Sequence, residues 1–197
     1  GLHTSESDEA DDLLSMGGGL LDDHTNTSVR NVVFWRNHAV LGGGAFALVG
    51  DEEASASAPS FTNVAFVGNF AGSRAGALAV LGSGAPVSCA GCRFVGNGAN
   101  GKGGALYLDF ASAALLSGET LLAHNGAARG GGALAVDGSS LAMLSGAATI
   151  EHNWARADGG GVYLGTWGFD GDEAIEAALS RNLVIATPAL AVRANRA

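Results

Sequence analysis

The 197-residue chain has few residues of several types, and each shortage excludes a class of protein. Aromatic residues make up only 7% of the chain, although apolar residues reach 47%, so any core consists mainly of small and branched side chains. Two cysteines are too few for a disulfide-stabilised framework. No run of about 20 apolar residues occurs, so no transmembrane segment is predicted.

Positive charge is also scarce. Ten Lys and Arg residues stand against 19 Asp and Glu residues, and the formal net charge of −9 makes nucleic acid an unfavourable partner. No signal peptide is recognisable, and the chain starts at Gly1 without a methionine. We therefore expect a mature or excerpted piece of a larger chain or assembly.

Glycine, in contrast, is abundant, with 32 residues that lack the three-residue period of collagen. The glycines belong to a phrase that alternates with a second phrase, in which a bulky apolar residue is followed three positions later by asparagine. The asparagine phrases are 34–37, 66–69, 94–97, 122–125 and 150–153, and the glycine phrases are 43–46, 75–78, 103–106, 131–134 and 160–163. The last four of these asparagines are equally spaced, and a fixed period of about 28 residues indicates a solenoid.

Within one period, Leu106 and Leu108 alternate with Ala105 and Tyr107, as in a β-strand. Three short strands and three turns leave no room for a crossover helix, so each strand is expected to pair in parallel with its equivalent one period later. The phenylalanines would stack inside, and the glycines would allow sharp bends. A structural ladder of side-chain amides is predicted at Asn37, Asn69, Asn97, Asn125 and Asn153.

This pattern resembles the repeat of the chlamydial polymorphic outer membrane proteins, in which GGA(I/L/V) and FxxN phrases alternate along a predicted right-handed parallel β-helix. The resemblance covers about Gly17 to Pro188; Ala75 replaces one glycine, and Leu122 and Ile150 replace the phenylalanine. It implies cell-surface or extracellular display and adhesion, and it carries no catalytic residues. We predict an all-β, single-stranded right-handed parallel β-helix of about five to six coils, each of about 28 residues.

The repeat sets the expected domain boundaries. Residues 1–16 form an acidic N-terminal cap or linker, residues 17–192 the β-helix with an insertion at about 166–179, and residues 193–197 a tail. The segment 172–179 has the pattern of a short amphipathic helix. Pro188 stands where the next ladder asparagine is expected, so the ladder is predicted to stop there.

Two pairs of residues recur one coil apart and suggest chemistry. Asp109 and Asp137 would stack and are either solvated turn residues or the acid and base of a carbohydrate-active enzyme, similar to a polysaccharide lyase or hydrolase. His124 and His152 would also stack, but no third ligand is apparent, so neither a metal nor any other cofactor is predicted. Cys89 and Cys92 form a lone CxxC that is either a pair of buried thiols or a local disulfide.

Two candidate contact surfaces remain. The basic residues Arg74, Lys102, Arg129 and Arg156 recur at nearly the interval of the asparagines and would form one column, which either binds an acidic glycan or protein or protects a sheet edge. A flat outer face would consist of small apolar residues and tyrosines, among them Ala77, Ala79, Ala105, Tyr107, Ala133, Ala135 and Tyr163. We expect a non-catalytic surface or scaffold module that binds a partner protein or glycan through one of these surfaces.

Overall fold

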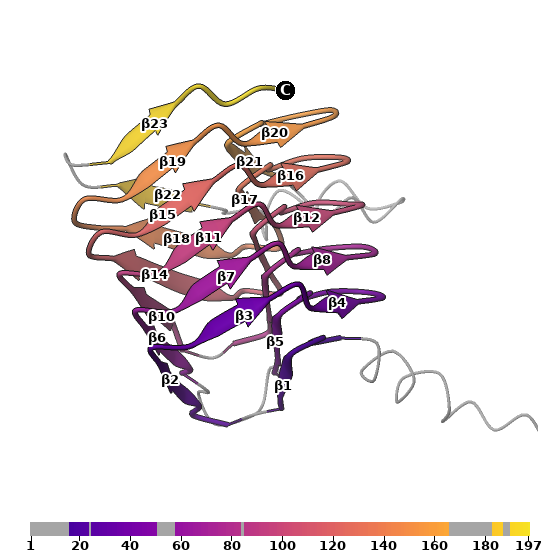
Figure 1. Cartoon of the computed structure of the whole chain (residues 1–197). Coiled ribbons are helices and arrows are strands. Elements are labelled where there is room, and N and C mark those ends of the chain that lie inside the picture. The colour runs from indigo at the N-terminus through magenta and orange to yellow at the C-terminus, as the bar shows by residue number, and fades with distance from the viewer. Residues whose placement is uncertain (1–15, 24, 51–57, 84, 166–182, 187–189) are drawn as a thin grey trace, which may run out of the picture.

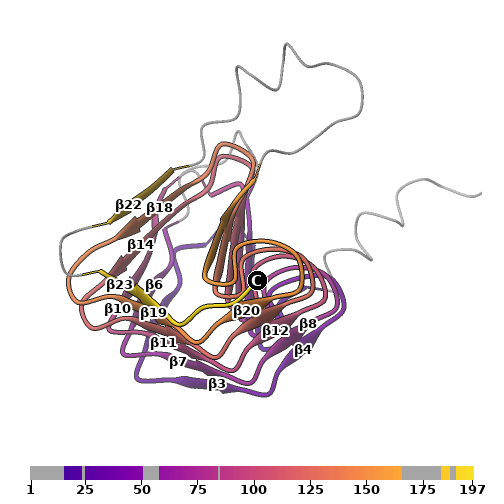
Figure 2. The same ribbon diagram turned by 90° about the horizontal axis from the view of Figure 1, so that it is seen from above.

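The computed structural model describes residues 16–23, 25–50, 58–83, 85–165, 183–186 and 190–197. It is an all-β solenoid of about five turns, in which each strand pairs in parallel with its equivalent in the next coil (Figure 1). Seen from above, with the C-terminal coil nearest the viewer, the chain runs anticlockwise from β18 through β19 to β20, so the solenoid is right-handed (Figure 2). The described residues contain no helix, and the helix expected at 172–179 lies outside them.

The strands form four parallel sheets, which we name A to D. Sheet A contains β1 (Leu20–Asp23), β5 (Phe46–Val49), β9 (Leu78–Leu81), β13 (Leu106–Asp109), β17 (Leu134–Val136) and β21 (Val162–Leu164). Sheet B contains β2 (Ser28–Arg30), β6 (Ser60–Thr62), β10 (Val87–Ala90), β14 (Ala113–Ser117), β18 (Leu141–Leu144) and β22 (Leu183–Ala186).

Sheet C follows sheet B in every coil. It contains β3 (Val33–Trp35), β7 (Ala65–Val67), β11 (Arg93–Val95), β15 (Leu121–Ala123), β19 (Thr149–Glu151) and β23 (Ala191–Arg193). Sheet D contains β4 (His38–Ala39), β8 (Phe70–Ala71), β12 (Gly98–Ala99), β16 (Gly126–Ala127) and β20 (Trp154–Ala155). Three strands per coil were predicted, and sheet D is the addition, because two-residue strands carry no periodic signal.

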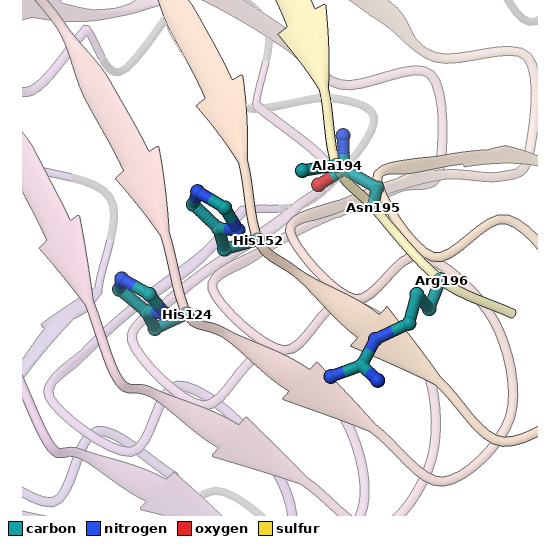
Figure 3. Close-up of a pocket in the computed structure, with 5 residues that line it drawn as sticks. All are labelled: His124, His152, Ala194, Asn195 and Arg196. Carbon is teal, nitrogen blue, oxygen red and sulfur yellow. The ribbon is translucent and has the colours of Figure 1, made fainter.

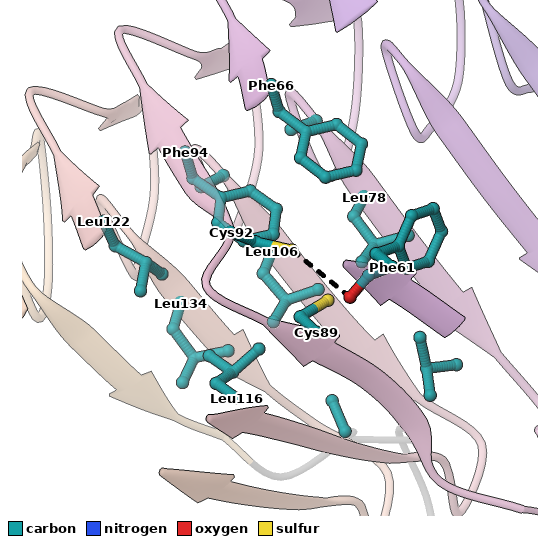
Figure 4. Packing of buried hydrophobic residues seen from close by; sticks show 14 of the residues in the cluster. Phe61, Phe66, Leu78, Cys89, Cys92, Phe94, Leu106, Leu116, Leu122 and Leu134 are labelled. Carbon is teal, nitrogen blue, oxygen red and sulfur yellow. Dashed lines mark hydrogen bonds between the residues drawn. The ribbon is translucent and has the colours of Figure 1, made fainter. Parts of the chain in front are cut away.

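Sheets A, B and C enclose the main core. The rings of Phe34 and Phe66 are stacked with centroids 5.2 Å apart, and those of Phe66 and Phe94 with centroids 4.7 Å apart. Register continues this row through Leu122 (Figure 4) and Ile150, which are also buried. The first residue of each asparagine phrase therefore fills the interior and contributes mainly through the burial of apolar surface.

The two glycines of a phrase meet different requirements. Gly103 has a φ of +69°, a left-handed conformation that disfavours other residues. At Gly104 a β-carbon would lie 2.1 Å from the carbonyl oxygen of Gly132, so the stacked coils leave no space for a side chain. Ala75 replaces the first type of glycine and adopts the same conformation with a φ of +57°. The first position thus tolerates alanine with strain, whereas the second requires glycine.

Sheet A is buried on both faces. Leu106 and Leu108 face the main core, while Tyr107, Ala79 and Ala135 belong to a second apolar cluster on the other side of the sheet. The segment that connects sheet D to sheet A folds back over this side (Figure 2). Sheet A is consequently an internal wall rather than an outer surface.

The last coil extends further than predicted. β23 pairs with β19, and Asn195 donates its side-chain amide to the carbonyl oxygen of Ile150. Asn195 also accepts hydrogen bonds from the backbone N and Nδ2 of Asn153, both at 2.9 Å. The ladder therefore continues from Asn153 to Asn195. The prediction that it stops at Pro188, which lies outside the described residues, was wrong, because the next ladder asparagine follows after 42 residues instead of one period.

Candidate functional site

The corner between sheets C and D is built by the asparagine phrases. Asn97 donates through Nδ2 to Asn125 Oδ1 and to the Phe66 carbonyl oxygen, both at 2.9 Å. Its Oδ1 accepts from the backbone N and the Nδ2 of Asn69, also at 2.9 Å. These amides are satisfied inside the protein, so they are unavailable to a ligand.

The residue before each ladder asparagine lies outside this corner in a left-handed conformation. The members of this row are Arg36, Gly68, Gly96, His124, His152 and Ala194, with φ between +51° and +66°. His124 and His152 are exposed, and their rings are stacked with centroids 5.2 Å apart. They line an open pocket of about 450 Å³ together with Ala194, Asn195 and Arg196 (Figure 3).

Asp109 and Asp137 do come together, but inside the protein, where they are 1% and 0% exposed. The hydroxyl of Tyr107 donates to Oδ2 of Asp109 at 2.7 Å and to Oδ2 of Asp137 at 3.1 Å. Burial, together with the hydrogen bond to Asp109, raises the pKa of Tyr107 well above its usual range, so the phenol stays protonated. At this burial neither carboxylate is exposed to a polysaccharide at the surface of the described residues.

Two of the four predicted basic residues neutralise these carboxylates. Lys102 Nζ lies 2.8 Å from Asp137 Oδ2, and Arg74 Nη1 lies 3.7 Å from Asp109 Oδ2. The same cations lie over aromatic rings: Arg74 is 5.3 Å from the centroid of Tyr107, and Lys102 is 4.7 Å from that of Tyr163. Arg74 and Lys102 therefore tie the connecting segment to sheet A.

The predicted single basic column does not form. The carbonyl oxygen of Arg74 accepts a hydrogen bond from the amide of Gly43, and one coil later the carbonyl oxygen of Lys102 accepts the equivalent bond from the amide of Ala75. Arg74 and Lys102 therefore hold equivalent positions in successive coils, and they are the only two of the four basic residues that do. In the next two coils that register is held by Gly130 and Asp158. Arg129 and Arg156 follow at intervals shorter than the period, which shifts them out of register, and they are exposed at other points of the connecting segment.

The predicted outer face of alanines and tyrosines is not exposed, so that prediction was wrong. Ala77, Ala79, Ala105, Tyr107, Ala133 and Ala135 are 0–1% exposed, and Tyr163 is half-buried. The connecting segment covers Ala79, Tyr107 and Ala135. Ala77, Ala105 and Ala133 instead face the main core, because the amides of Ala105 and Leu106 both bond to the Ala133 carbonyl, which interrupts the alternation before β13 begins.

Cys89 and Cys92 are free thiols buried in the main core (Figure 4). A hydrogen bond between them raises the pKa of Cys89, with burial acting in the same direction, and lowers that of Cys92. Cys92 Sγ also lies 3.6 Å from the carbonyl oxygen of Phe61. Both thiols act as small core residues in this structure.

A surface that the sequence did not reveal lies on the outside of sheet C. Val33 and Trp35 are 63% and 61% exposed, and Arg36 lies 4.8 Å from the Trp35 ring centroid. Register places Val67 beside Trp35, and Val95 beside Val67. We call Val33, Trp35, Ala65, Val67 and Val95 the sheet C stripe. Outward positions of this strand carry no motif, which is why the repeat did not point to them.

Among the described residues, which leave out positions 1–15, 24, 51–57 and 84 as well as 166–182 and 187–189, no three His, Cys, Asp or Glu side chains are grouped as a metal site. The same described part of the chain contains no helix long and apolar enough to span a bilayer.

A short part of the chain matches a known family of repeats. Residues 91–109, which include Phe94–Asn97 and Gly103–Leu106, match the Chlamydia polymorphic membrane protein repeat. No curated protein and no solved structure shows significant similarity to the chain. The match agrees with the repeat recognised in the sequence and with the β-solenoid.

Proposed function

We propose that this chain is a non-catalytic, surface-displayed contact module that binds a partner protein or glycan through the sheet C stripe. The single observation that carries the proposal is the exposure of Val33 and Trp35 beside further apolar side chains on one outer sheet face. Contiguous apolar surface of this kind is typical of interaction sites. The repeat match supports it, because proteins described as polymorphic membrane proteins carry the same phrases.

The alternative, a carbohydrate-active enzyme that uses Asp109 and Asp137, receives no support from the geometry. An acid and base must reach the glycosidic oxygen. Both carboxylates are instead buried and already bonded to Tyr107, and each has a cation beside it. Their arrangement explains how the connecting segment is held on sheet A, which is a folding role.

Adhesion of protein-coated beads to a cell monolayer tests the proposal. The double substitution Trp35→Ser, Val67→Asp changes two register neighbours of the stripe. The matched control is Leu115→Asp, Met143→Ser, which changes two register neighbours on the outer face of sheet B. Met143 is 39% exposed and Leu115 is half-buried, so both pairs combine one exposed and one half-buried apolar residue.

We expect the stripe variant to lower bead adhesion at least about tenfold, because removal of a central contact residue costs about 2 kcal/mol or more. The sheet B variant should adhere like the unchanged chain, and both should keep the far-ultraviolet circular dichroism of the parent. Adhesion of the unchanged chain no better than albumin-coated beads, or equal loss in both variants, would refute the proposal.

A further inference from the structure

The corner pocket, lined by His124, His152, Ala194, Asn195 and Arg196, is open for a structural reason. His124, His152 and Ala194 hold equivalent positions in three successive coils, each with φ between +51° and +57°. The two imidazoles stack on each other, but the third position carries only a methyl group. The loss of ring volume at Ala194 leaves a hollow beside His152, and Arg196 lies at the far side of this hollow (Figure 3).

The polar side chains around the hollow can donate hydrogen bonds to an anion, Arg196 through its guanidinium and each imidazole through a ring N–H. Arg196 and His152 are exposed, and no ion pair within the described residues engages Arg196. The acid beside them, Glu151, is already bound by Arg193, with Nε and Oε2 2.8 Å apart. This hydrogen bond, with smaller contributions from the nearby histidines, lowers the pKa of Glu151, so it stays paired and ionised. In a chain of net charge −9 such a donor-rich hollow is distinctive.

An exposed aromatic side chain lies on sheet D, next to Arg196 in the backbone register but outside the lining of the hollow. Trp154 forms a bridge with Arg196 in the backbone register and is 50% exposed. A β-carbon on Gly126 would lie 2.3 Å from the Trp154 indole, so the ring packs directly on the glycine backbone of the previous coil. One ring face thus rests on the sheet while half of the side chain remains open to solvent. Such a surface suits the apolar face of a sugar ring.

We propose that the corner pocket binds a sulfated sugar of an acidic glycan. Three donor side chains, His124, His152 and Arg196, surround the hollow from three coils, which suits the three oxygens of a sulfate ester better than the two of a carboxylate. Trp154 supports the ring of the same or the adjoining sugar. The inference rests on the proposed surface function for its biological meaning, but it uses residues outside the sheet C stripe.

Calorimetric titration of the full chain with a heparin-derived octasaccharide, at physiological ionic strength, tests this site. The substitutions are Arg196→Gln, which removes charge, and His152→Asn, because asparagine tolerates the left-handed conformation at this position. Each should weaken binding about tenfold, as expected for loss of a charge-assisted hydrogen bond. Trp154→Ala should weaken binding about fivefold.

The matched controls change exposed side chains of similar kind that lie outside both the pocket and the sheet C stripe. Arg129→Gln changes an exposed arginine of the connecting segment, and Phe110→Ala changes an exposed aromatic residue directly after β13. Both should bind the octasaccharide like the parent. Circular dichroism of every variant establishes that the fold is kept, and the bead assay with the stripe variant tests the proposed function separately.

Several results would overturn the sulfated-sugar assignment. These are absence of octasaccharide binding, equal weakening by Arg129→Gln, or binding of a desulfated octasaccharide or a glutamate octapeptide as tight as that of the sulfated probe. The last result would point to an acidic protein partner instead. Octasaccharide binding that is lost only in the pocket variants, while the stripe variant retains it, supports the site whatever the outcome of the adhesion assay.

Discussion

Substituting alanine for Asn97 removes an amide from the middle of the ladder, where the side chain is 1% exposed. Four hydrogen bonds of 2.9 Å are lost with it. Two N–H donors of Asn69, one on the backbone and one on the side chain, then lose their acceptor in a buried environment. One substitution therefore removes bonds from Asn97 to the coil before it and to the coil after it.

The expected loss follows from these bonds. A net contribution of about 1 kcal/mol per hydrogen bond, with up to about 3 kcal/mol for a buried group left unsatisfied, gives a loss of roughly 3–5 kcal/mol in the free energy of unfolding. Asn37→Ala is the control. Asn37 is half-buried, and its side chain makes one hydrogen bond among the described residues, to Asn69 Oδ1, so about 1 kcal/mol is expected.

Urea denaturation followed by far-ultraviolet circular dichroism measures both variants against the parent. The midpoint should fall markedly for Asn97→Ala and slightly for Asn37→Ala, with similar slopes. If the two variants lose equal stability, the hydrogen-bonded ladder does not hold the coils together, and the account of the asparagine phrase fails.

Three further changes test the packing of sheet A. Lys102→Met leaves Asp137 as a buried charge without its cation, so we expect urea denaturation to show about 2–3 kcal/mol of destabilisation. The control, Arg129→Met, changes an exposed arginine and should alter the free energy of unfolding by no more than about 0.5 kcal/mol. Equal losses in the two variants would contradict the pairing of Lys102 with Asp137. Folding raises the pKa of Tyr107, so this residue adds stability that is present below its unfolded pKa of about 10 and is lost as the pH rises further. The melting temperature should therefore fall more steeply with rising alkaline pH for the parent than for Tyr107→Phe. Parallel curves of melting temperature against pH would contradict this. Gly104→Ala should prevent folding or lower the melting temperature sharply, because its β-carbon would meet the Gly132 carbonyl, and a parent-like melt would show that the coils can separate there.

The repeated residues predicted the fold because each has a role that every coil needs. Phe94 fills the interior, Asn97 bonds to its neighbours, and Gly103 adopts a conformation that glycine favours. Because every coil needs these residues at the same places, the motifs recur once in every repeat, and their even spacing was enough to predict a parallel solenoid. The β-strands of sheet D escaped prediction, since two residues such as Gly98–Ala99 show no alternation.

The errors about surfaces share a physical origin. The prediction of an outer alanine face assumed one core, but the connecting segment after sheet D covers Ala79 and Ala135 and creates a second. The prediction of one basic column failed because the interval from Lys102 to Arg129 is shorter than the asparagine period, which moves Arg129 out of register with Lys102. This difference could have been read from the sequence. The exposure of Trp35 and Trp154 was not readable, because it depends on which side of a short strand faces inward.

We propose that the outward side chains of sheet C, rather than the repeated residues, carry the contact function. The most direct test replaces every residue of the sheet C stripe with threonine or lysine, while every inward residue is kept, and measures bead adhesion together with the melting temperature. We expect a melting temperature within a few degrees of the parent and adhesion at the level of albumin-coated beads. Parent-like adhesion by this folded variant would show that the stripe is not the contact surface.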